Sequence, residues 1–130
     1  MDAGIIFHFF PRLDPTARER CLKLGELYSY WNQRINVISR KDMEHLYVRH
    51  VLHSLALSAA TTDNPFTAGA TILDAGTGGG FPGIPLAILH PQSRFILCDS
   101  IAKKIKVVRE ISDSLGLDNV TAVVSRVEQM

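Results

Sequence analysis

Apolar positions in the first part of the chain repeat with the period of an α-helix. They recur at alternating intervals of four and three residues, at Ala17, Cys21, Leu24, Tyr28, Trp31 and Ile35. Asp14 followed by Pro15 marks the helix start, because aspartate caps free amide groups and proline fits the first helical position. The pattern predicts an amphipathic helix that begins at Pro15 and includes Ile35.

A second helix, or a broken pair of helices, is predicted from about Asp42 to Ala60. The positions expected on its buried side are Met43, Leu46, Val51, Leu55 and Ala59. Turn-forming residues then cluster over residues 61–69, between two regions of different pattern. We therefore expect an N-terminal helical segment over residues 1–60 and a linker over residues 61–70.

Beyond the linker, the pattern is typical of alternating strands and helices. Short runs of β-favouring residues predict three strands, at Thr71–Leu73, Arg94–Cys98 and Val120–Val124. A short helix fits Gly83–Leu89, and a longer one follows the second strand, where Ser100 can cap its start and Gly116 lies past its end. Its apolar stripe consists of Ile101, Ile105, Val108, Ile111 and Leu115.

This order of elements predicts an α/β fold with a parallel sheet buried on both faces. Right-handed crossovers would place the carboxyl ends of the strands, and any ligand, at one edge of the sheet. A chain of 130 residues with 46% hydrophobic and 21% charged residues fits a single core.

The net charge, the first apolar run and the cysteine spacing further limit the class of protein. Fourteen basic and thirteen acidic residues give a net charge of +1, so binding to nucleic acid would require a local patch. The apolar run Ile5–Phe10 is too short for a signal peptide or a membrane span, and we expect a cytoplasmic protein. Cys21 and Cys98 lack disulfide or zinc spacing, so two buried thiols are expected.

The most informative stretch runs from Leu73 to Gly83, where the first strand leads into the first helix. Five glycines within eight positions let the backbone turn sharply and approach a ligand. Asp74, at the end of the first strand, suits a ligand with a cationic amino group and would repel a pyrophosphate. Asp99, at the end of the second strand, suits the hydroxyls of a ribose. The resulting order, an acid followed by glycines at Gly76, Gly78 and Gly80, resembles the arrangement seen in S-adenosylmethionine-dependent methyltransferases.

Other interpretations of this stretch remain open. The spacing Gly78-x-Gly80-x-x-Gly83 also satisfies the dinucleotide pattern, so an NAD-binding oxidoreductase is one alternative, although Phe81-Pro82 removes an amide donor there. A non-catalytic fragment that binds RNA or the cofactor is another. Each acid also has a purely structural alternative. Asp99 would then only cap the next helix, and Asp74 would only accept hydrogen bonds from amides of its own turn.

Further blocks of residues carry a family resemblance. They are Trp31–Ser39, Val48–Leu52, Asp74–Leu86, Asp99–Arg109 and Ser125–Glu128. With them, residues 13–130 resemble the bacterial 16S ribosomal RNA guanine-N7 methyltransferases, also called glucose-inhibited division protein B. The resemblance implies a Rossmann-like, doubly wound class I methyltransferase sheet. Residues 71–130 would be its first half, and the chain would be an N-terminal fragment.

The resemblance also implies ligands and site residues. The cofactor would be S-adenosyl-L-methionine, bound by Asp74, Gly76, Gly78, Gly80, Phe81, Asp99, Val127 and Glu128. Among these, Asp99 would hold the ribose, and Val127 and Glu128 would flank the adenine. The substrate would be one guanine in a loop of 16S ribosomal RNA, within the small ribosomal subunit. Guanine N7 carries a lone pair and no proton, so no general base is required and no catalytic residue is assigned.

Contact with RNA would come from basic residues near the cofactor edge. The candidates are Arg40, Lys41, Arg49 and His50. His53 stands where the family usually has an aspartate, and the histidines of this region do not have metal-ligand spacing, so no metal is expected. A second basic group is either a solvated helix face or a phosphate contact, and consists of Lys103, Lys104, Lys106 and Arg109.

Overall fold

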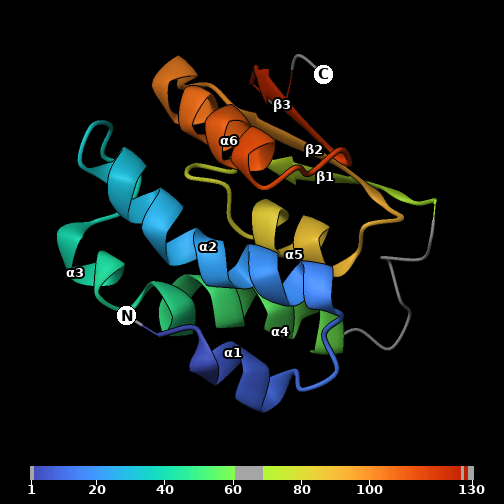
Figure 1. The fold of residues 1–130 in the computed structure, drawn as a ribbon. Helices are drawn as coiled ribbons and strands as arrows, with labels where there is room; N and C mark the ends of the chain where they lie inside the picture. The colour runs from blue at the N-terminus through green and yellow to red at the C-terminus, as the bar shows by residue number, and fades with distance from the viewer. Residues whose placement is uncertain (1, 61–68, 127, 129–130) are drawn as a thin grey trace.

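The computed structural model describes residues 2–60, 69–126 and 128, and it packs a set of helices against one side of a small sheet (Figure 1). The first half contains α1 (Gly4–Phe9), α2 (Pro15–Asn32), α3 (Arg40–Met43), the π-helix η1 (Leu46–Leu52) and α4 (His53–Ala60). The second half contains β1 (Thr71–Ala75), α5 (Gly83–Leu89), β2 (Arg94–Asp99), α6 (Ala102–Ser114) and β3 (Val120–Val124).

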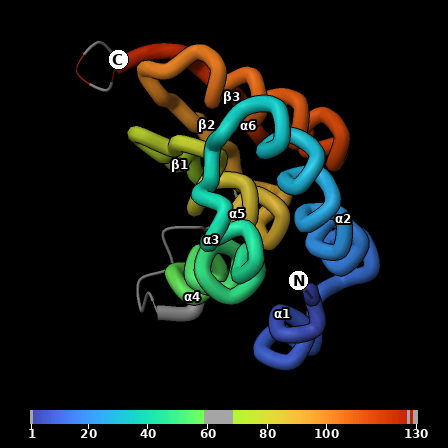
Figure 2. Tube along the Cα trace, turned by 90° about the vertical axis from the view of Figure 1, so that its left-hand side faces the viewer, coloured from blue at the N-terminus to red at the C-terminus, as the bar shows by residue number. Residues whose placement is uncertain are grey.

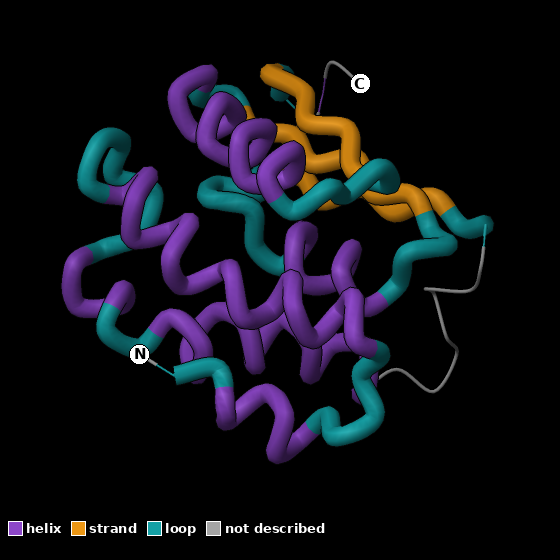
Figure 3. Tube along the Cα trace, in the orientation of Figure 1, coloured by secondary structure: helices purple, strands orange, loops and turns teal. Residues whose placement is uncertain are grey.

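The sheet has the order β1-β2-β3, and both strand pairs are parallel. The two crossovers move along the sheet in the same direction, so right-handed connections place α5 and α6 on the same face. Figure 2 shows both helices on that side of the strands, and Figure 3 shows the strands gathered at one end of the molecule. The predicted fold class, helices followed by the first part of a Rossmann-like sheet, is confirmed.

The opposite face of the sheet differs from the prediction. We expected a sheet buried on both faces, but this face carries exposed residues, namely Thr71, Leu73, Ala75 and Thr121. Within the described residues, helices therefore cover one face only. The strands are apolar enough for two covered faces, which is why their sequence alone suggested them.

Helix α2 follows its sequence signals closely. Asp14 accepts a hydrogen bond from the amide of Ala17 at 2.8 Å, and Pro15 takes the first helical position. The helix ends before Ile35, however, so the predicted extent is too long. The reason lies in the side chain of Asn32, which accepts hydrogen bonds from the amides of Val37 and Ile38 and thereby turns the chain away from the helix axis.

The second predicted helix is a broken series of three elements, α3, η1 and α4. Leu46, Val51 and Leu55 are buried as expected, and Met43 is half-buried. The side chain of Ala59 and residues 61–68 of the predicted 61–70 linker lie outside the described residues. The apolar run near the start, considered above only as a targeting segment, forms α1 with Ile6 fully buried.

Both halves of the chain contribute to a single cluster of buried residues. Arg20 on α2 donates hydrogen bonds to the carbonyls of Leu115 and Gly116, both at 2.9 Å, and so joins α2 to the end of α6. Gly116 ends that helix with a φ of 68°, as predicted. The predicted cap at Ser100 is wrong, because α6 begins at Ala102 without a side-chain cap.

Two further features concern the chain as a whole. Cys21 and Cys98 are buried free thiols, as the sequence predicted. Burial raises the pKa of Cys21 to about 11, so its thiol is neutral at physiological pH. In the parts of the chain that the structure describes, every helix is too short or too polar to cross a membrane.

Candidate functional site

Asp74 lies near the end of β1, and its side chain stabilises the glycine-rich turn through hydrogen bonds. One of its carboxylate oxygens accepts hydrogen bonds from the hydroxyl of Thr77 at 2.6 Å and from the amide of Gly83 at 3.0 Å. Burial raises the pKa of this carboxyl, and the charge of Asp99 raises it further, while the two hydrogen bonds oppose the shift. The local role considered for Asp74 is therefore present, and its contact with a cofactor stays a prediction.

Asp99 lies at the end of β2 and connects two loops. Its oxygens accept hydrogen bonds from the amides of Gly78 and Ile101, each at 2.9 Å. The carboxylate thus supports the turn before α6 without capping that helix, contrary to the local interpretation, and it also reaches across to the glycine-rich turn. It remains half-buried at the surface of a cavity.

This cavity opens at the carboxyl ends of all three strands and has a volume of about 440 Å³. Its lining includes Ala75, Gly76, Asp99, Ser100, Ser125 and Glu128. Gly76 has a φ of +68°, and a Cβ there would meet no atom within 4 Å, so the backbone faces open space. The structure thus brings together Gly76, Asp99 and Glu128, while Val127 lies outside the described residues.

Two other predicted cofactor residues, Gly78 and Gly80, lie within the glycine-rich turn itself. Gly80 is buried, and a Cβ there would lie 2.8 Å from the hydroxyl of Tyr28 and 2.6 Å from the side chain of Ile84. Gly78 is half-buried and donates its amide to Asp99. Gly80 therefore permits close packing in this structure, and a direct contact between it and a cofactor stays a prediction.

Tyr28 on α2 supports the turn and was not identified from the sequence. Its buried hydroxyl donates a hydrogen bond of 2.6 Å to the carbonyl of Gly79. Its ring stacks on Phe81 with a centroid distance of 4.9 Å, and the ring of His50 contacts Phe81 at 5.0 Å. Burial raises the pKa of Tyr28 far above its usual range, and the charge of Asp74 adds to this. In the sequence, Tyr28 belonged to the apolar series of α2, so only a core role was expected.

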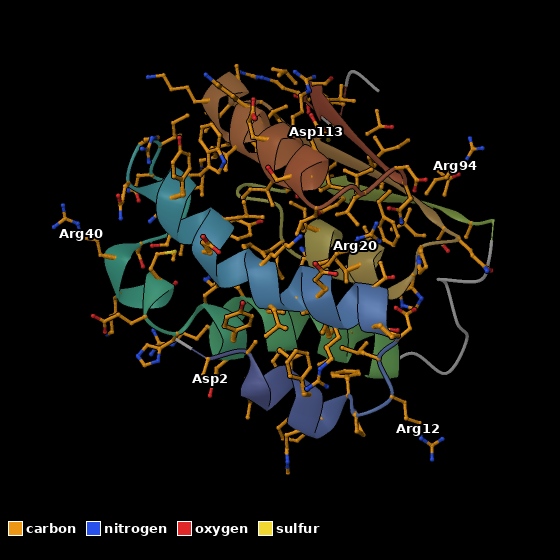
Figure 4. The ribbon with its side chains drawn as sticks, in the orientation of Figure 1. Asp2, Arg12, Arg20, Arg40, Arg94 and Asp113 are labelled. Atoms are coloured by element: carbon orange, nitrogen blue, oxygen red, sulfur yellow. The ribbon has the colours of Figure 1, made fainter. Side chains whose placement is uncertain are left out.

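The predicted RNA contacts fall into two groups. Arg49 forms an ion pair of 2.9 Å with Asp42, and this hydrogen bond holds the pKa of Asp42 below its usual value. His50 Nε2 lies 3.5 Å from the same carboxylate and has no hydrogen bond to any described residue. Arg40 and Lys41 are exposed on α3, and Figure 4 shows Arg40 pointing away from the molecule. Their contact with RNA stays a prediction.

The basic residues of α6 are less uniform than the sequence suggested. Lys103, Lys106 and Arg109 are exposed, and Lys104 is half-buried. Arg109 donates a hydrogen bond of 2.8 Å to the carbonyl of Ala122 and so attaches α6 to β3. Among the described residues, no group of three His, Cys, Asp or Glu side chains is placed to hold a metal ion.

Comparison with known proteins agrees with this architecture. A family model described as GidB, rRNA small subunit methyltransferase G, matches residues 18–130. The chain is 54% identical over 130 residues to the ribosomal RNA small subunit methyltransferase G of Christiangramia forsetii, covering 100% of this chain and 60% of that relative. It is 52% identical over 126 residues to the protein of the same name from Porphyromonas gingivalis, covering 97% of this chain and 56% of the relative.

The chain thus spans 56% to 60% of the length of these relatives. The family match includes α2 from its second turn onward, the glycine-rich turn, and all three strands. The chain belongs to the GidB family of rRNA small subunit methyltransferase G proteins.

Proposed function

We propose that this chain is the S-adenosylmethionine-binding part of an enzyme that methylates N7 of one guanine in 16S ribosomal RNA. One observation carries the proposal. Asp99 ends β2, Glu128 follows β3 and Gly76 follows β1. All three residues line one cavity. Ligands of open α/β sheets bind at this edge, so the cavity is where a nucleoside is expected.

The residues of the cavity fit this cofactor. Its volume of about 440 Å³ lies within the range of about 300–1,000 Å³ that is usual for small-molecule sites. Asp99 would accept hydrogen bonds from the ribose hydroxyls, Glu128 would lie beside the adenine, and Gly76 leaves space that a Cβ would fill. When bound, S-adenosylmethionine supplies a methyl group on a positively charged sulfur.

Methylation of guanine N7 requires little acid–base catalysis by the protein. The N7 lone pair is available at neutral pH, so the protein has to hold the base and the methyl donor in line. Positioning of this kind contributes about 7–11 kcal/mol to lowering a barrier. A rigid turn, held by Asp74, Asp99 and Tyr28, serves that purpose.

The geometry of the turn argues against NAD as the ligand. A dinucleotide pyrophosphate binds to the free amides at the start of the helix that follows the first strand. In this chain the amide of Gly83, the first residue of α5, donates to Asp74. A carboxylate therefore occupies the place that a phosphate would need.

The test uses small ribosomal subunits that lack this methylation, with labelled S-adenosylmethionine. We expect label on N7 of one guanine, and label on another base or on protein would overturn the substrate assignment. Cofactor binding is tested separately by calorimetry with S-adenosylhomocysteine. Asp99→Asn should lose affinity at least tenfold, by analogy with other buried hydrogen bonds to charged groups of about 1.5–3 kcal/mol. Asp113→Asn, an exposed acid on α6 (Figure 4), is the matched control. Equal affinities of the two variants would contradict the assignment of Asp99.

A further inference from the structure

A groove with a polar rim lies between the end of α2, the segment over residues 33–39, and α3. Two cavities of about 440 and 290 Å³ adjoin there and share Asn32, Gln33 and Arg40. The lining of this α2–α3 groove consists of Ser29, Asn32, Gln33, Arg34, Asn36, Arg40 and Met43. Ser29, Asn32 and Met43 are half-buried, whereas the other four residues are exposed, so the groove has a mixed floor and an accessible polar rim.

The charge of the α2–α3 groove is positive. Residues 34–41 include Arg34, Arg40 and Lys41 and contain no acid. Neither cavity has an acidic residue in its lining. The next acid along the chain, Asp42, is paired with Arg49 at 2.9 Å. Two arginines with no acidic residue in the lining favour an anionic ligand, because guanidinium pairs with phosphate and carboxylate groups.

An aromatic side chain beside the groove indicates which class of anionic ligand fits it. Tyr30 is 49% exposed, and the guanidinium of Arg34 lies 3.6 Å over the centre of its ring. Arg34 also donates a hydrogen bond of 2.7 Å to the carbonyl of Tyr30, so the pair has a defined geometry. Unpaired RNA bases stack on aromatic rings and on guanidinium planes. An acidic peptide offers carboxylates but no planar bases, so the site fits single-stranded RNA better.

The α2–α3 groove is connected to the glycine-rich turn through Asn32 and Val37. The side chain of Asn32 holds the backbone of Val37 and Ile38 through three hydrogen bonds of 2.8 to 2.9 Å. Val37 in turn packs against the glycine-rich turn, since a Cβ on Gly79 would lie 3.2 Å from its side chain. A nucleotide next to one bound in the groove would therefore lie close to this turn.

We propose that the α2–α3 groove binds the phosphate backbone of a single-stranded RNA segment, with Arg34 and Arg40 as phosphate contacts and Tyr30 as a stacking surface. The proposal rests on the proposed function, because RNA is the substrate there. It adds the route by which RNA approaches the cavity at the strand ends. It also assigns the contact to arginines outside any described ion pair rather than to Arg49, which is also exposed but is paired with Asp42.

The experiment measures binding of the full chain to a fluorescein-labelled single-stranded oligoribonucleotide by anisotropy, over a range of salt concentrations. The test variant is the double substitution Arg34→Gln and Arg40→Gln. The control is Arg12→Gln and Arg94→Gln, which makes the same change in net charge. Figure 4 shows Arg40 at one end of the molecule and Arg12 and Arg94 at the other. All four side chains are exposed, so circular dichroism is expected to show unchanged folding.

We expect the test variant to bind about tenfold more weakly and to lower the slope of log affinity against log salt by about 1.4, for two lost contacts with a single strand. The control should stay within twofold of the unaltered chain. A Tyr30→Ala variant should weaken binding by about fivefold or more through lost stacking, without a change in the salt slope. Replacement of both groove arginines by lysine should keep the slope.

Several outcomes would overturn the proposal. They are no RNA binding by the unaltered chain, equal losses in the test and control variants, or competition by polyglutamate as strong as by unlabelled RNA. The last result would indicate an acidic protein as the partner. Failure of the proposed function is distinguished by calorimetry with S-adenosylhomocysteine. If the unaltered chain binds RNA through the groove but does not bind S-adenosylhomocysteine, the cofactor assignment is wrong and the assignment of the groove to RNA is retained.

Discussion

Replacement of Tyr28 by phenylalanine tests whether the helical segment supports the glycine-rich turn. The substitution removes one oxygen and keeps the ring that stacks on Phe81 at 4.9 Å. The carbonyl of Gly79 then loses a donor at 2.6 Å. Because Tyr28 is fully buried, water does not replace this donor readily. The turn is thus deprived of a single hydrogen bond, with little change in packing.

The expected cost follows from this geometry. A buried acceptor without its partner destabilises a fold by about 1–3 kcal/mol. At about 3–6 °C per kcal/mol for a chain of this size, a loss of about 2 kcal/mol lowers Tm by about 6–12 °C. The bond joins residues 51 positions apart, on α2 and on the turn, so part of the cost should appear in ligand binding. A share of about 1 kcal/mol weakens S-adenosylhomocysteine binding about fivefold.

Thermal unfolding and calorimetry measure the two effects. Tyr47→Phe is the control, because the buried hydroxyl of Tyr47 donates to the carbonyl of Cys21 at 2.7 Å and accepts from the amide of Gly25 at 2.9 Å, both within the helical segment. We expect both variants to unfold at lower temperature, and only Tyr28→Phe to bind the ligand more weakly. The reasoning is refuted if Tyr28→Phe unfolds like the unaltered chain, or if both variants bind the ligand equally well.

Three further substitutions test other contacts, each by the free energy of unfolding in urea. Gly83→Ala should cost about 1–3 kcal/mol, because the new Cβ would lie 2.6–2.8 Å from the side chain of Leu97; stability equal to the unaltered chain would mean that α5 shifts freely. Arg20→Met should cost about 1–2 kcal/mol through two lost hydrogen bonds to the end of α6, and an unchanged value would show that this junction adds nothing. Asp74→Asn should change the pH dependence of stability. Burial raises the pKa of Asp74, so the folded chain loses stability as the pH rises from the usual value of 3.8 through the raised one. The variant lacks this loss, so its stability relative to the unaltered chain should rise over that pH range and then stay constant; a stability difference independent of pH would contradict the shift.

The sequence predicted those elements whose signals are local. Asp14 and Pro15 fix the start of α2, and Gly116 fixes the end of α6, because each acts on its own neighbours. The end of α2 was predicted too late, because the side chain of Asn32 binds amides five and six residues further on. The apolar period continues to Ile35 and carries no sign of this competition. Hydrogen bonds between polar side chains and the backbone thus decide where a helix ends within a periodic apolar pattern.

The candidate site was predictable only in part, for a related reason. The strand-terminal acids and the glycines stand out, because their spacing is typical of a ligand site. Tyr28 does not, because a tyrosine in an apolar series is equally suited to a core, and its partner Gly79 lies far along the chain. The exposure of Arg40 and the pairing of Arg49 with Asp42 also depend on how α3 and η1 pack. Contacts between distant segments carry no periodic signal.

The register of the sheet explains why the two strand-terminal acids have different surroundings. Asp74 pairs with Leu97, and Asp99 follows Leu97 by two residues on the same face of β2. At about 3.3 Å per residue, Asp99 lies about 6–7 Å further toward the carboxyl edge. Asp74 is consequently enclosed by the turn, whereas Asp99 extends past the end of β1 into the cavity. A change at Asp74 should therefore affect stability first, and a change at Asp99 should affect nucleoside binding first.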